Sequence, residues 1–425
     1  MNKKLPIFSR RAFLGSCLMT TACVAADQQS IMPPREVNGI RYSQSGPNIH
    51  LYRNAFGYPT ANRHTYWSVE HSVDGFSNLG NLLPSRRSLA GSTASTIRQS
   101  TIEPNITYQG SPVLERGTFN VDDYLNKHPV TGLIITKGNQ ILVERYQYSR
   151  TDQHQFTSFS MAKTLIAIMI GIAVSEGHIS SIDDKAETYV SSLAGTEFGA
   201  TPIRYLLTMS SGIQFRENYF GNDDVATLSR LTIQQNSFGG AWAIREFNTR
   251  ISAPGQTWNY SSADTYVLAL VLKNAIKKNI ATYFSEKIWQ PIGAESTASW
   301  LIDAAGNEVG YMGFNAVLRD YARLAIMLAH KGKYNNQQII PPVWFNEMFN
   351  DQTGTGYGFQ TWIYPRTFPN EEQNFALKGV RGQGILIDTN RQIALIQTAV
   401  RTRPVDGVGN HELLAFWHGI KRSLR

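Results

Sequence analysis

The stretch Ser160-Met-Ala-Lys-Thr-Leu-Ile-Ala-Ile-Met-Ile-Gly-Ile-Ala-Val174 decides how this 425-residue sequence is interpreted. Its apolar part, residues 164–174, is about half as long as the ~18 residues expected of a membrane span, so it predicts a buried core helix. We expect the helix to run from Ser160 to about Glu176, because Gly177 follows as a helix breaker. Ser160 and Lys163 are three positions apart, which places both side chains on one face of the helix.

A serine and a lysine in this arrangement can act as a nucleophile and its base. Serine is a poor nucleophile without a base, and lysine serves as one only when burial lowers its pKa and leaves it neutral. A serine in the first helical turn also offers its own N–H to a developing oxyanion. The alternative is an N-capping serine followed by a lysine that extends to solvent. The tetrapeptide alone favours this alternative, because Ser-x-x-Lys should occur about once by chance in such a chain.

A second candidate segment is Pro254-Gly-Gln-Thr-Trp-Asn-Tyr-Ser-Ser-Ala-Asp264. Pro-Gly predicts a turn, and Tyr260 and Ser262 alternate onto one side just before a helix predicted over 262–277. A phenol at Tyr260 could share a proton with Lys163 and pass it to a leaving group. Ser262 could complete the hydrogen-bond network. The alternative is a buried tyrosine beside a helix cap.

Two further segments indicate a site only in combination with the two candidate segments above. Leu206-Leu-Thr-Met-Ser-Ser-Gly-Ile213 predicts a helix that ends in a Ser-Ser-Gly turn. Lys378-Gly-Val-Arg-Gly-Gln-Gly384 lies at the edge of a predicted strand, where glycines let a ligand approach backbone N–H groups. The alternative for this segment is a β-bulge or a hairpin turn.

Other chemistries have no support in the sequence. It contains no Gly-x-Ser-x-Gly, no His-Glu-x-x-His and no phosphate-binding Gly-Lys-Ser/Thr loop. The nine histidines are scattered, and both cysteines, Cys17 and Cys23, lie near the N-terminus. We therefore expect no metal site, no cofactor and no disulfide in the mature protein.

The order of predicted elements indicates an α/β (α+β) fold. A β-hairpin is predicted over 132–146, and late strands are predicted over 357–364, 375–380, 383–388 and 392–399, followed by a helix near 411–422. Helices are predicted between them, one opening at Thr201 as N-cap and others over 223–236, 262–277, 319–331 and 341–349. This order predicts one antiparallel sheet built from both chain ends and flanked by helices. A mostly helical second lobe, about residues 178–320, would leave a cleft between the lobes.

Residues 1–26 are predicted to be an export signal. Ser9-Arg-Arg-Ala-Phe-Leu14 resembles a twin-arginine motif, and Val24-Ala-Ala26 suits cleavage. We therefore expect a periplasmic or secreted bacterial protein; an ordinary secretory signal and a lipid anchor on Cys23 are the alternatives. Residues 27–117 lack sustained periodicity and carry many aromatics, which predicts an arm that wraps a domain spanning residues 118–425.

The charge balance argues against nucleic acid as a partner. The formal net charge is +8, with 40 Lys plus Arg against 32 Asp plus Glu. Four of the basic residues lie in the export signal, and without them 36 basic residues face 32 acidic ones. No basic block follows, and no apolar run is long enough for a transmembrane span.

Taken together, the motifs resemble the class C β-lactamase-type serine hydrolase family. The resemblance rests on residues 160–163, 206–212, 254–262, Trp289-Gln-Pro-Ile-Gly293 and Gly382-Gln383, in that order. It covers the chain from about Thr118 to the C-terminus. The segments Gly379–Gln383 and Phe215–Tyr219 are most similar to the 6-aminohexanoate-dimer hydrolase and family VIII esterase branch. The Lys-Thr-Gly motif that helps lactamases hold the β-lactam carboxylate is missing near 374–384.

The resemblance implies a role for each matching residue. Ser160 would be the acylated nucleophile, Lys163 its proton partner and Tyr260 the third catalytic group. Substrate contacts would come from Ser262, where lactamases usually have asparagine, from Tyr219, and from the Val380 N–H as a second oxyanion donor.

We therefore expect an exported, metal-independent serine hydrolase that cleaves a small-molecule ester or amide through an acyl-enzyme on Ser160. A β-lactamase or a D-alanyl-D-alanine carboxypeptidase is the alternative of the same class. A penicillin-binding protein that acylates without turnover, or an envelope-binding protein without catalysis, is the alternative of another class. The natural substrate and the oligomeric state stay open.

Overall fold

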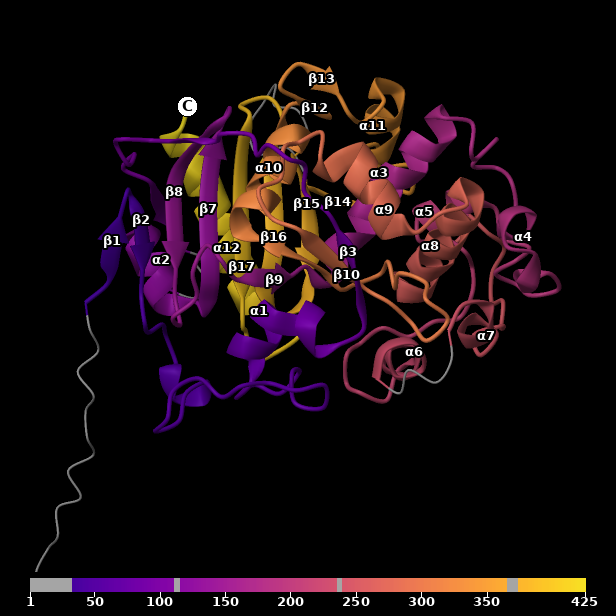
Figure 1. The fold of residues 1–425 in the computed structure, drawn as a ribbon, viewed down its shortest axis with the longest axis horizontal. Helices are drawn as coiled ribbons and strands as arrows, with labels where there is room; N and C mark the ends of the chain where they lie inside the picture. The colour runs from indigo at the N-terminus through magenta and orange to yellow at the C-terminus, as the bar shows by residue number, and fades with distance from the viewer. Residues whose placement is uncertain (1–32, 111–114, 235–238, 365–373) are drawn as a thin grey trace, which may run out of the picture. The chain divides into compact units, whose positions relative to one another are not determined.

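The computed structural model describes residues 33–110, 115–234, 239–364 and 374–425, so the predicted export signal lies outside the described residues. Its centre is a mixed sheet in which strands from the first part of the chain form one half and strands from the last part form the other (Figure 1). In spatial order the sheet contains β1 (Arg35–Val37), β2 (Ile40–Tyr42), β8 (Gln140–Tyr146), β7 (Val130–Lys137), β17 (Ile393–Ala399), β16 (Gln383–Asp388), β15 (Asn374–Gly379) and β14 (Trp362–Tyr364), with β4 (Arg98–Gln99) also beside β8.

This sheet confirms the predicted architecture. From β8 to β14 all neighbours are antiparallel, and β7 pairs directly with β17, so the early hairpin and the late strands form one surface. Only β2 and β4 run parallel to β8. Because strand side chains alternate, β17 directs Ala394 and Ile396 into one apolar core and Ile393 and Leu395 into another.

Helices cover both faces of the sheet. The C-terminal helix α12 (Gly407–Ser423) buries Phe416, Trp417 and Ile420 in the smaller core, together with α2 (Val121–Lys127). On the other face lie α10 (Leu318–Ala329) and the buried helix α3 (Ala162–Ser175), which confirms the helix predicted from the opening stretch. α3 is buried all round because α8 (Ser262–Ile276) packs against it and other residues of the large core surround it.

The helical middle of the chain lies to one side of the sheet in Figure 1. Its remaining helices are α4 (Ala186–Tyr189), α5 (Ile203–Leu207), α6 (Asp224–Ser229), α7 (Ala241–Ile244) and α9 (Ile280–Phe284), and α11 (Pro342–Met348) follows α10.

Residues before Thr118 contain more regular structure than their sequence pattern predicts. They supply β1, β2 and β4 to the main sheet and form the helix α1 (Ser72–Leu82). They also supply β3 (Ser85–Ser88) to a second sheet with β10 (Ala298–Leu301), β11 (Phe314–Val317) and β9 (Gln155–Thr157). Two further short antiparallel pairs are present, β5 (Thr107–Gln109) with β6 (Thr118–Asn120) and β12 (Lys333–Tyr334) with β13 (Gln337–Gln338).

Several predicted boundaries are wrong; the helix predicted near 411–422, for example, begins at Gly407. The strand predicted over 357–364 is confined to β14, because Gln360 adopts φ 54° and its N–H donates to the Leu207 carbonyl instead of a strand partner. The helix predicted to be capped by Thr201 has Pro202 as its N-cap. The helix predicted over 223–236 is α only to Ser229 and continues as a wider π-turn to Gln234.

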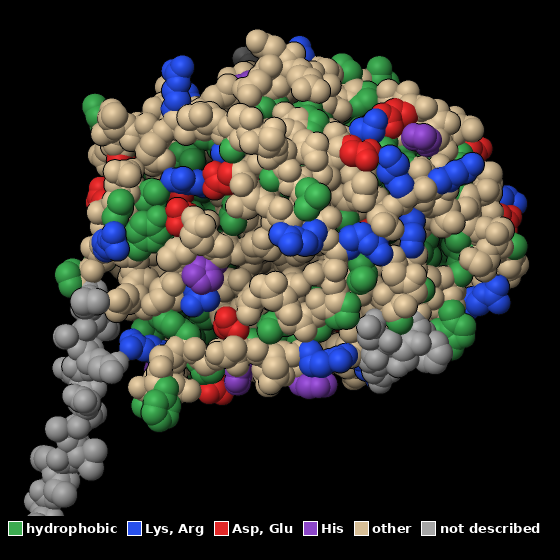
Figure 2. Space-filling view, viewed as in Figure 1, with side chains coloured by type: hydrophobic (Ala, Val, Ile, Leu, Met, Phe, Trp, Pro, Cys, Tyr) green, Lys and Arg blue, Asp and Glu red, His purple; other side chains and the backbone are tan. Residues whose placement is uncertain are grey.

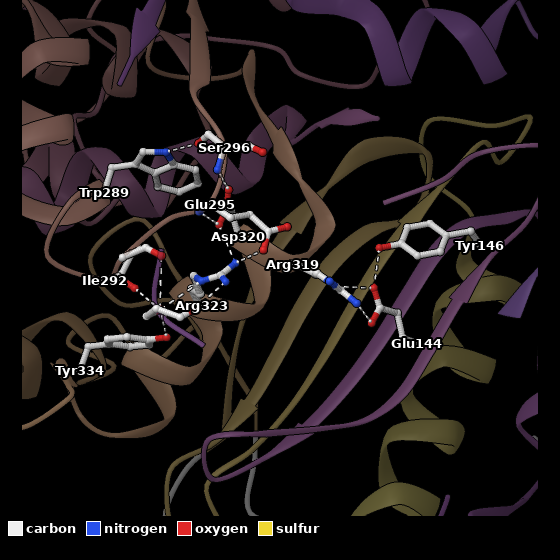
Figure 3. A network of polar contacts seen from close by, with 12 residues as sticks. Glu144, Tyr146, Trp289, Ile292, Glu295, Ser296, Arg319, Asp320, Arg323 and Tyr334 are labelled. Carbon is white, nitrogen blue, oxygen red and sulfur yellow. Dashed lines mark hydrogen bonds and ion pairs between the residues drawn. The ribbon is translucent and has the colours of Figure 1, made fainter. Parts of the chain in front are cut away.

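Charged side chains of α10 contact both the main sheet and the segment that leads into β10 (Figure 3). Arg319 donates twice to the buried Glu144 of β8, at 2.9 and 3.1 Å, and Tyr146 donates to the same carboxylate. One turn on, Arg323 pairs with Asp320 at 2.8 Å. The Asp320 carboxylate accepts the backbone N–H groups of Glu295 and Ser296, just before β10. On the outer surface, basic side chains are dispersed over the face seen in Figure 2.

Candidate active site

Ser160 lies in a strained turn between β9 and α3. The turn is a single 3₁₀ turn, Phe159–Met161. Phe159 has φ 41°, a conformation that is unfavourable for a residue with a Cβ. The Phe159 ring is held edge-on by Trp67 and Phe76, with centroid separations of 5.4 and 4.9 Å. This packing stabilises the turn and leaves the Ser160 side chain partly exposed at the start of a helix.

Lys163 is buried directly behind Ser160. Its Nζ lies 3.3 Å from Ser160 Oγ. It also donates to Ser262 Oγ at 2.9 Å and to the Tyr311 carbonyl oxygen at 3.0 Å. Burial lowers the pKa of Lys163 to about 8, although the nearby carboxylate of Glu217 acts in the opposite direction. A substantial fraction of the amine is therefore neutral near pH 7 to 8, as a base for serine must be.

Tyr260 lies on the other side of the serine. Its hydroxyl hydrogen-bonds with the Ser160 side chain, and its ring centroid is 5.1 Å from Lys163 Nζ. Burial raises the pKa of Tyr260, so the phenol stays protonated at neutral pH and can donate a proton. An aromatic cluster fixes the ring, formed by Trp258, Tyr357 and Trp362.

A carboxylate, Glu217, lies where the second candidate segment meets the loop after the Ser-Ser-Gly turn. It accepts the Ser262 N–H at 2.7 Å, the Ser262 hydroxyl at 2.9 Å and the Tyr219 hydroxyl at 2.7 Å. Tyr219 itself has φ 66°, and its N–H donates to Asp223 at 2.5 Å. The loop is therefore held in a strained conformation by two acidic side chains.

The Ser-Ser-Gly turn supports α8. Ser211 donates to Asp264 at 3.0 Å, and burial raises the pKa of Asp264 to about 7. Ser261 caps α8 by accepting the Asp264 N–H at 3.2 Å. Together these bonds fix the first turn of α8, on which Ser262 is positioned.

The end of β15 lies against the Ser160 turn. A Cβ on Gly379 would be 2.5 Å from the Ser158 carbonyl oxygen and 3.2 Å from Phe159 Cβ, so only glycine allows this approach. The next residue, Val380, lines the same two cavities as Ser160. The backbone N–H groups of Ser160 and Val380 are thus the candidate donors to an oxyanion.

Two cavities of about 260 and 240 Å³ meet at Ser160, and Tyr219 lines both. The first is bounded by Trp362 and Lys378 of the main sheet. The second is bounded by Tyr66 and Trp67 from the N-terminal part of the chain, and by α6.

Lys378 gives the first cavity a cationic wall. Its Nζ lies 4.8 Å from the centroid of Trp362 and 5.8 Å from that of Tyr364. Within the described part of the chain the Lys378 side chain has no ion-pair or hydrogen-bond partner. Burial lowers the pKa of Lys378, and the neighbouring Arg401 adds to this effect.

The structure therefore brings together every residue singled out from the sequence, namely Ser160, Lys163, Tyr219, Tyr260, Ser262 and Val380. Sequence reasoning missed the carboxylates Glu217 and Asp264 and the cation Lys378, although all three lie inside quoted motifs. Glu217 could have been suspected, because it is the one acid between two aromatics, Phe215 and Tyr219. Among the described residues no group of three or more His, Cys, Asp or Glu could hold a metal ion.

The fold and this arrangement of serine, lysine and tyrosine define a serine hydrolase. The sequence profile described as "Beta-lactamase" matches residues 120–415, and the chain belongs to this family. Among the described residues, no helix combines the length and hydropathy needed to cross a membrane.

Individual relatives support the same class. The chain is 22% identical over 391 residues to the 6-aminohexanoate-dimer hydrolase of Paenarthrobacter ureafaciens, a match that covers 87% of this chain and 93% of the relative. A Bacillus anthracis structure, provisionally described as a 6-aminohexanoate-dimer hydrolase, superposes with a TM-score of 0.74 at 19% identity, covering 87% of this chain and 99% of that one. A family VIII carboxylesterase superposes with a TM-score of 0.52 at 16% identity, covering 69% and 93%. At these identities the structural matches describe the fold alone.

Proposed function

We propose that the protein hydrolyses a small-molecule ester or unstrained amide through an acyl-enzyme on Ser160. One observation carries the proposal: the Lys163 Nζ, buried and with its pKa lowered to about 8, lies 3.3 Å from Ser160 Oγ. A lysine held in this way can accept the serine proton at neutral pH.

Acylation follows from the positions of the groups. Lys163 takes the Ser160 hydroxyl proton as Oγ attacks the carbonyl carbon, and the oxyanion forms beside the N–H groups of Ser160 and Val380. The bond to the leaving alcohol or amine then breaks, and Tyr260 donates the proton that the leaving group needs. The Lys163 proton restores the phenol. In deacylation a water molecule takes the place of the leaving group and attacks the acyl carbon, and the same pair removes its proton. This proton returns to Ser160 Oγ as the bond between Oγ and the acyl carbon breaks.

The cationic wall of the first cavity favours substrates that carry a carboxylate. Lys378 lies on that wall without an anionic partner among the described residues, and a desolvated charge gains most from an ionic hydrogen bond. The Paenarthrobacter relative is named for the 6-aminohexanoate dimer. A linear amide or ester with a terminal carboxylate therefore fits this chain better than a β-lactam, since the Lys-Thr-Gly motif is missing.

The first test is hydrolysis of p-nitrophenyl butyrate by the mature protein, beside Ser160→Ala and Lys163→Ala, with nitrocefin in parallel. A matched control is Ser192→Ala, which changes an exposed serine outside the cleft. Ester turnover that is lost in both site variants and kept in the control, with a transient acyl adduct seen by mass spectrometry, supports the proposal. Rapid nitrocefin cleavage would favour a β-lactamase, and release of D-alanine from a pentapeptide would favour a carboxypeptidase. An adduct without turnover, or no chemistry at all, would favour a binding protein.

We also propose that the protein is exported and acts in the periplasm or outside the cell. The support is the twin-arginine-like segment Ser9–Leu14 and the Val24-Ala-Ala26 cleavage site. Fractionation of cells that express the full chain tests this, together with the N-terminal mass of the product. An unprocessed protein in the cytoplasmic fraction would contradict export, and a lipidated Cys23 would replace cleavage after Ala26.

A further inference from the structure

Glu217 ends a continuous chain of hydrogen bonds that begins at the candidate nucleophile. Ser160 Oγ lies 3.3 Å from Lys163 Nζ, and Lys163 Nζ lies 2.9 Å from Ser262 Oγ. Ser262 Oγ lies 2.9 Å from the Glu217 carboxylate, which also accepts the Tyr219 hydroxyl. No step of the proposed reaction assigns a role to this carboxylate.

The direction of each bond in the chain can be deduced from the groups present. A carboxylate only accepts, so the single Ser262 hydroxyl hydrogen points to Glu217. Ser262 Oγ must then accept from Lys163, and the Tyr311 carbonyl can also only accept from Lys163. A neutral amine has two N–H bonds and one lone pair. Both N–H bonds are used by Ser262 and Tyr311, so the lone pair is left for Ser160.

We propose that Glu217 is a positioning residue that, by fixing the Ser262 hydroxyl as an acceptor toward Lys163, directs the lysine lone pair at Ser160. This inference rests on the proposed function of Ser160 and Lys163. Without the carboxylate, the Ser262 hydroxyl could rotate and donate to the Lys163 lone pair, in competition with Ser160. The Glu217 carboxylate also accepts the hydroxyl of Tyr219, which lines both cavities. It therefore connects Lys163, through Ser262, to a side chain that both cavities share.

The charge of Glu217 has a second, measurable effect. The titratable groups that face Lys163 are Glu217 from its loop, Asp264 from α8, and the phenols Tyr260 and Tyr311. Glu217 favours the protonated lysine, in opposition to the larger effect of burial. Removing its charge should therefore lower the pKa of Lys163, by about one unit for a carboxylate at this range.

The test is Glu217→Gln, which keeps the shape and can still accept one hydrogen bond. We expect kcat for a p-nitrophenyl ester to fall about 10- to 100-fold, while the acidic limb of kcat/KM moves to lower pH. Ser262→Ala should lower kcat by a similar factor, and the double variant should be no worse than either single variant, because both interrupt the same chain. Glu246→Gln is the matched control, since that carboxylate is exposed and lines neither cavity.

Two outcomes would overturn the proposal. One is a Glu217→Gln enzyme with wild-type kcat. The other is a Glu217→Gln enzyme that loses activity without a shift of the acidic limb, and whose loss adds to that of Ser262→Ala in the double variant. General destabilisation would have this effect. The pKa of Lys163 can also be measured without turnover, from the NMR titration of lysine labelled at Cε. If the wild-type protein hydrolyses nothing, the proposed function fails; an unchanged Lys163 pKa in Glu217→Gln refutes the role of Glu217 independently.

Discussion

Substitution of Gly379 by alanine isolates the contribution of the β15 backbone to the proposed chemistry. Gly379 has φ −127°, which alanine adopts without strain, so the only penalty is steric. The added Cβ would lie 2.5 Å from the Ser158 carbonyl oxygen, whereas real Cβ contacts are at least 3.0 Å and usually above 3.4 Å. The strand end must therefore move away from the Ser160 turn by roughly 0.5 to 0.9 Å.

This displacement acts on the oxyanion donors, because Val380 follows Gly379 directly while Ser160 lies in the opposing turn. Loss of one well-placed donor costs about 10²- to 10³-fold in kcat. A displacement of this size can approach that loss even though the N–H is still present. Overpacking of this kind costs about 1–3 kcal/mol of stability. We therefore expect Gly379→Ala to fold and to lose about 10²-fold in kcat, with Lys163 and Tyr260 in place.

The assay is steady-state hydrolysis of p-nitrophenyl butyrate, with thermal unfolding measured in parallel. Gly91→Ala is the matched control, since a Cβ there meets nothing closer than 3.8 Å. A folded Gly379→Ala enzyme with kcat within threefold of wild type would refute the placement of an oxyanion donor at Val380. The same result would mean that the close approach of β15 only supports packing.

Three other perturbations give distinct readouts. Lys163→Met should lower kcat about 10²- to 10⁴-fold and abolish the acidic limb of the pH profile of kcat/KM. In the wild type this limb should have its midpoint near the Lys163 pKa of about 8, and an unchanged limb in the variant would contradict a lysine base. Lys378→Met should lower by about tenfold the preference for a carboxylated ester over a neutral one, measured as the ratio of kcat/KM values, and an unchanged ratio would remove the anion-binding role. Burial lowers the pKa of His128 to about 4, so as the pH falls His128 is protonated in the unfolded state before it is protonated in the folded state. About 2 kcal/mol of the free energy of unfolding should therefore be lost between pH 7 and pH 5. His128→Phe should reduce this loss in urea unfolding, whereas the exposed His64→Gln should not; equal pH dependence in all three proteins would contradict the assignment.

The parts of the fold that were predicted correctly are those with strong local patterns. The hairpin of β7 and β8, the late strands β15 to β17 and the core helix α3 all follow from apolar runs with clear breakers. Strand 357–364 was overpredicted because its residues favour strands, while a tertiary hydrogen bond from Gln360 to Leu207 imposes a turn. The short strands β3 and β10 escaped notice because each is stabilised by its partner, far away in the sequence.

The residues of the candidate site also differ in how far the sequence alone could predict them. Ser160 and Lys163 were recognisable because helical spacing alone brings them together. Tyr260 and Ser262 needed the resemblance to a family, since nothing local links residues 260–262 to α3. Glu217 could be suspected from the sequence but not given a role, because its contacts depend on a loop with a left-handed Tyr219 that returns to the start of α8. Lys378 was hidden for a related reason: only the assembled sheet shows that it faces a cavity without an anionic partner among the described residues.

The arrangement of acids around Lys163 explains how a lysine can be a base between two carboxylates. A direct ion pair would raise its pKa and hold it protonated. Glu217 is instead separated from Nζ by the Ser262 hydroxyl, and Asp264 is engaged by Ser211. Burial then outweighs both charges, and the pKa of Lys163 falls to about 8. A serine at position 262 is therefore suited to this site, because its hydroxyl can accept a hydrogen bond from the Lys163 amine and donate one to the Glu217 carboxylate at the same time. Glu217 is then close enough to orient Lys163 through Ser262, but too far from Nζ to hold the lysine in its protonated form.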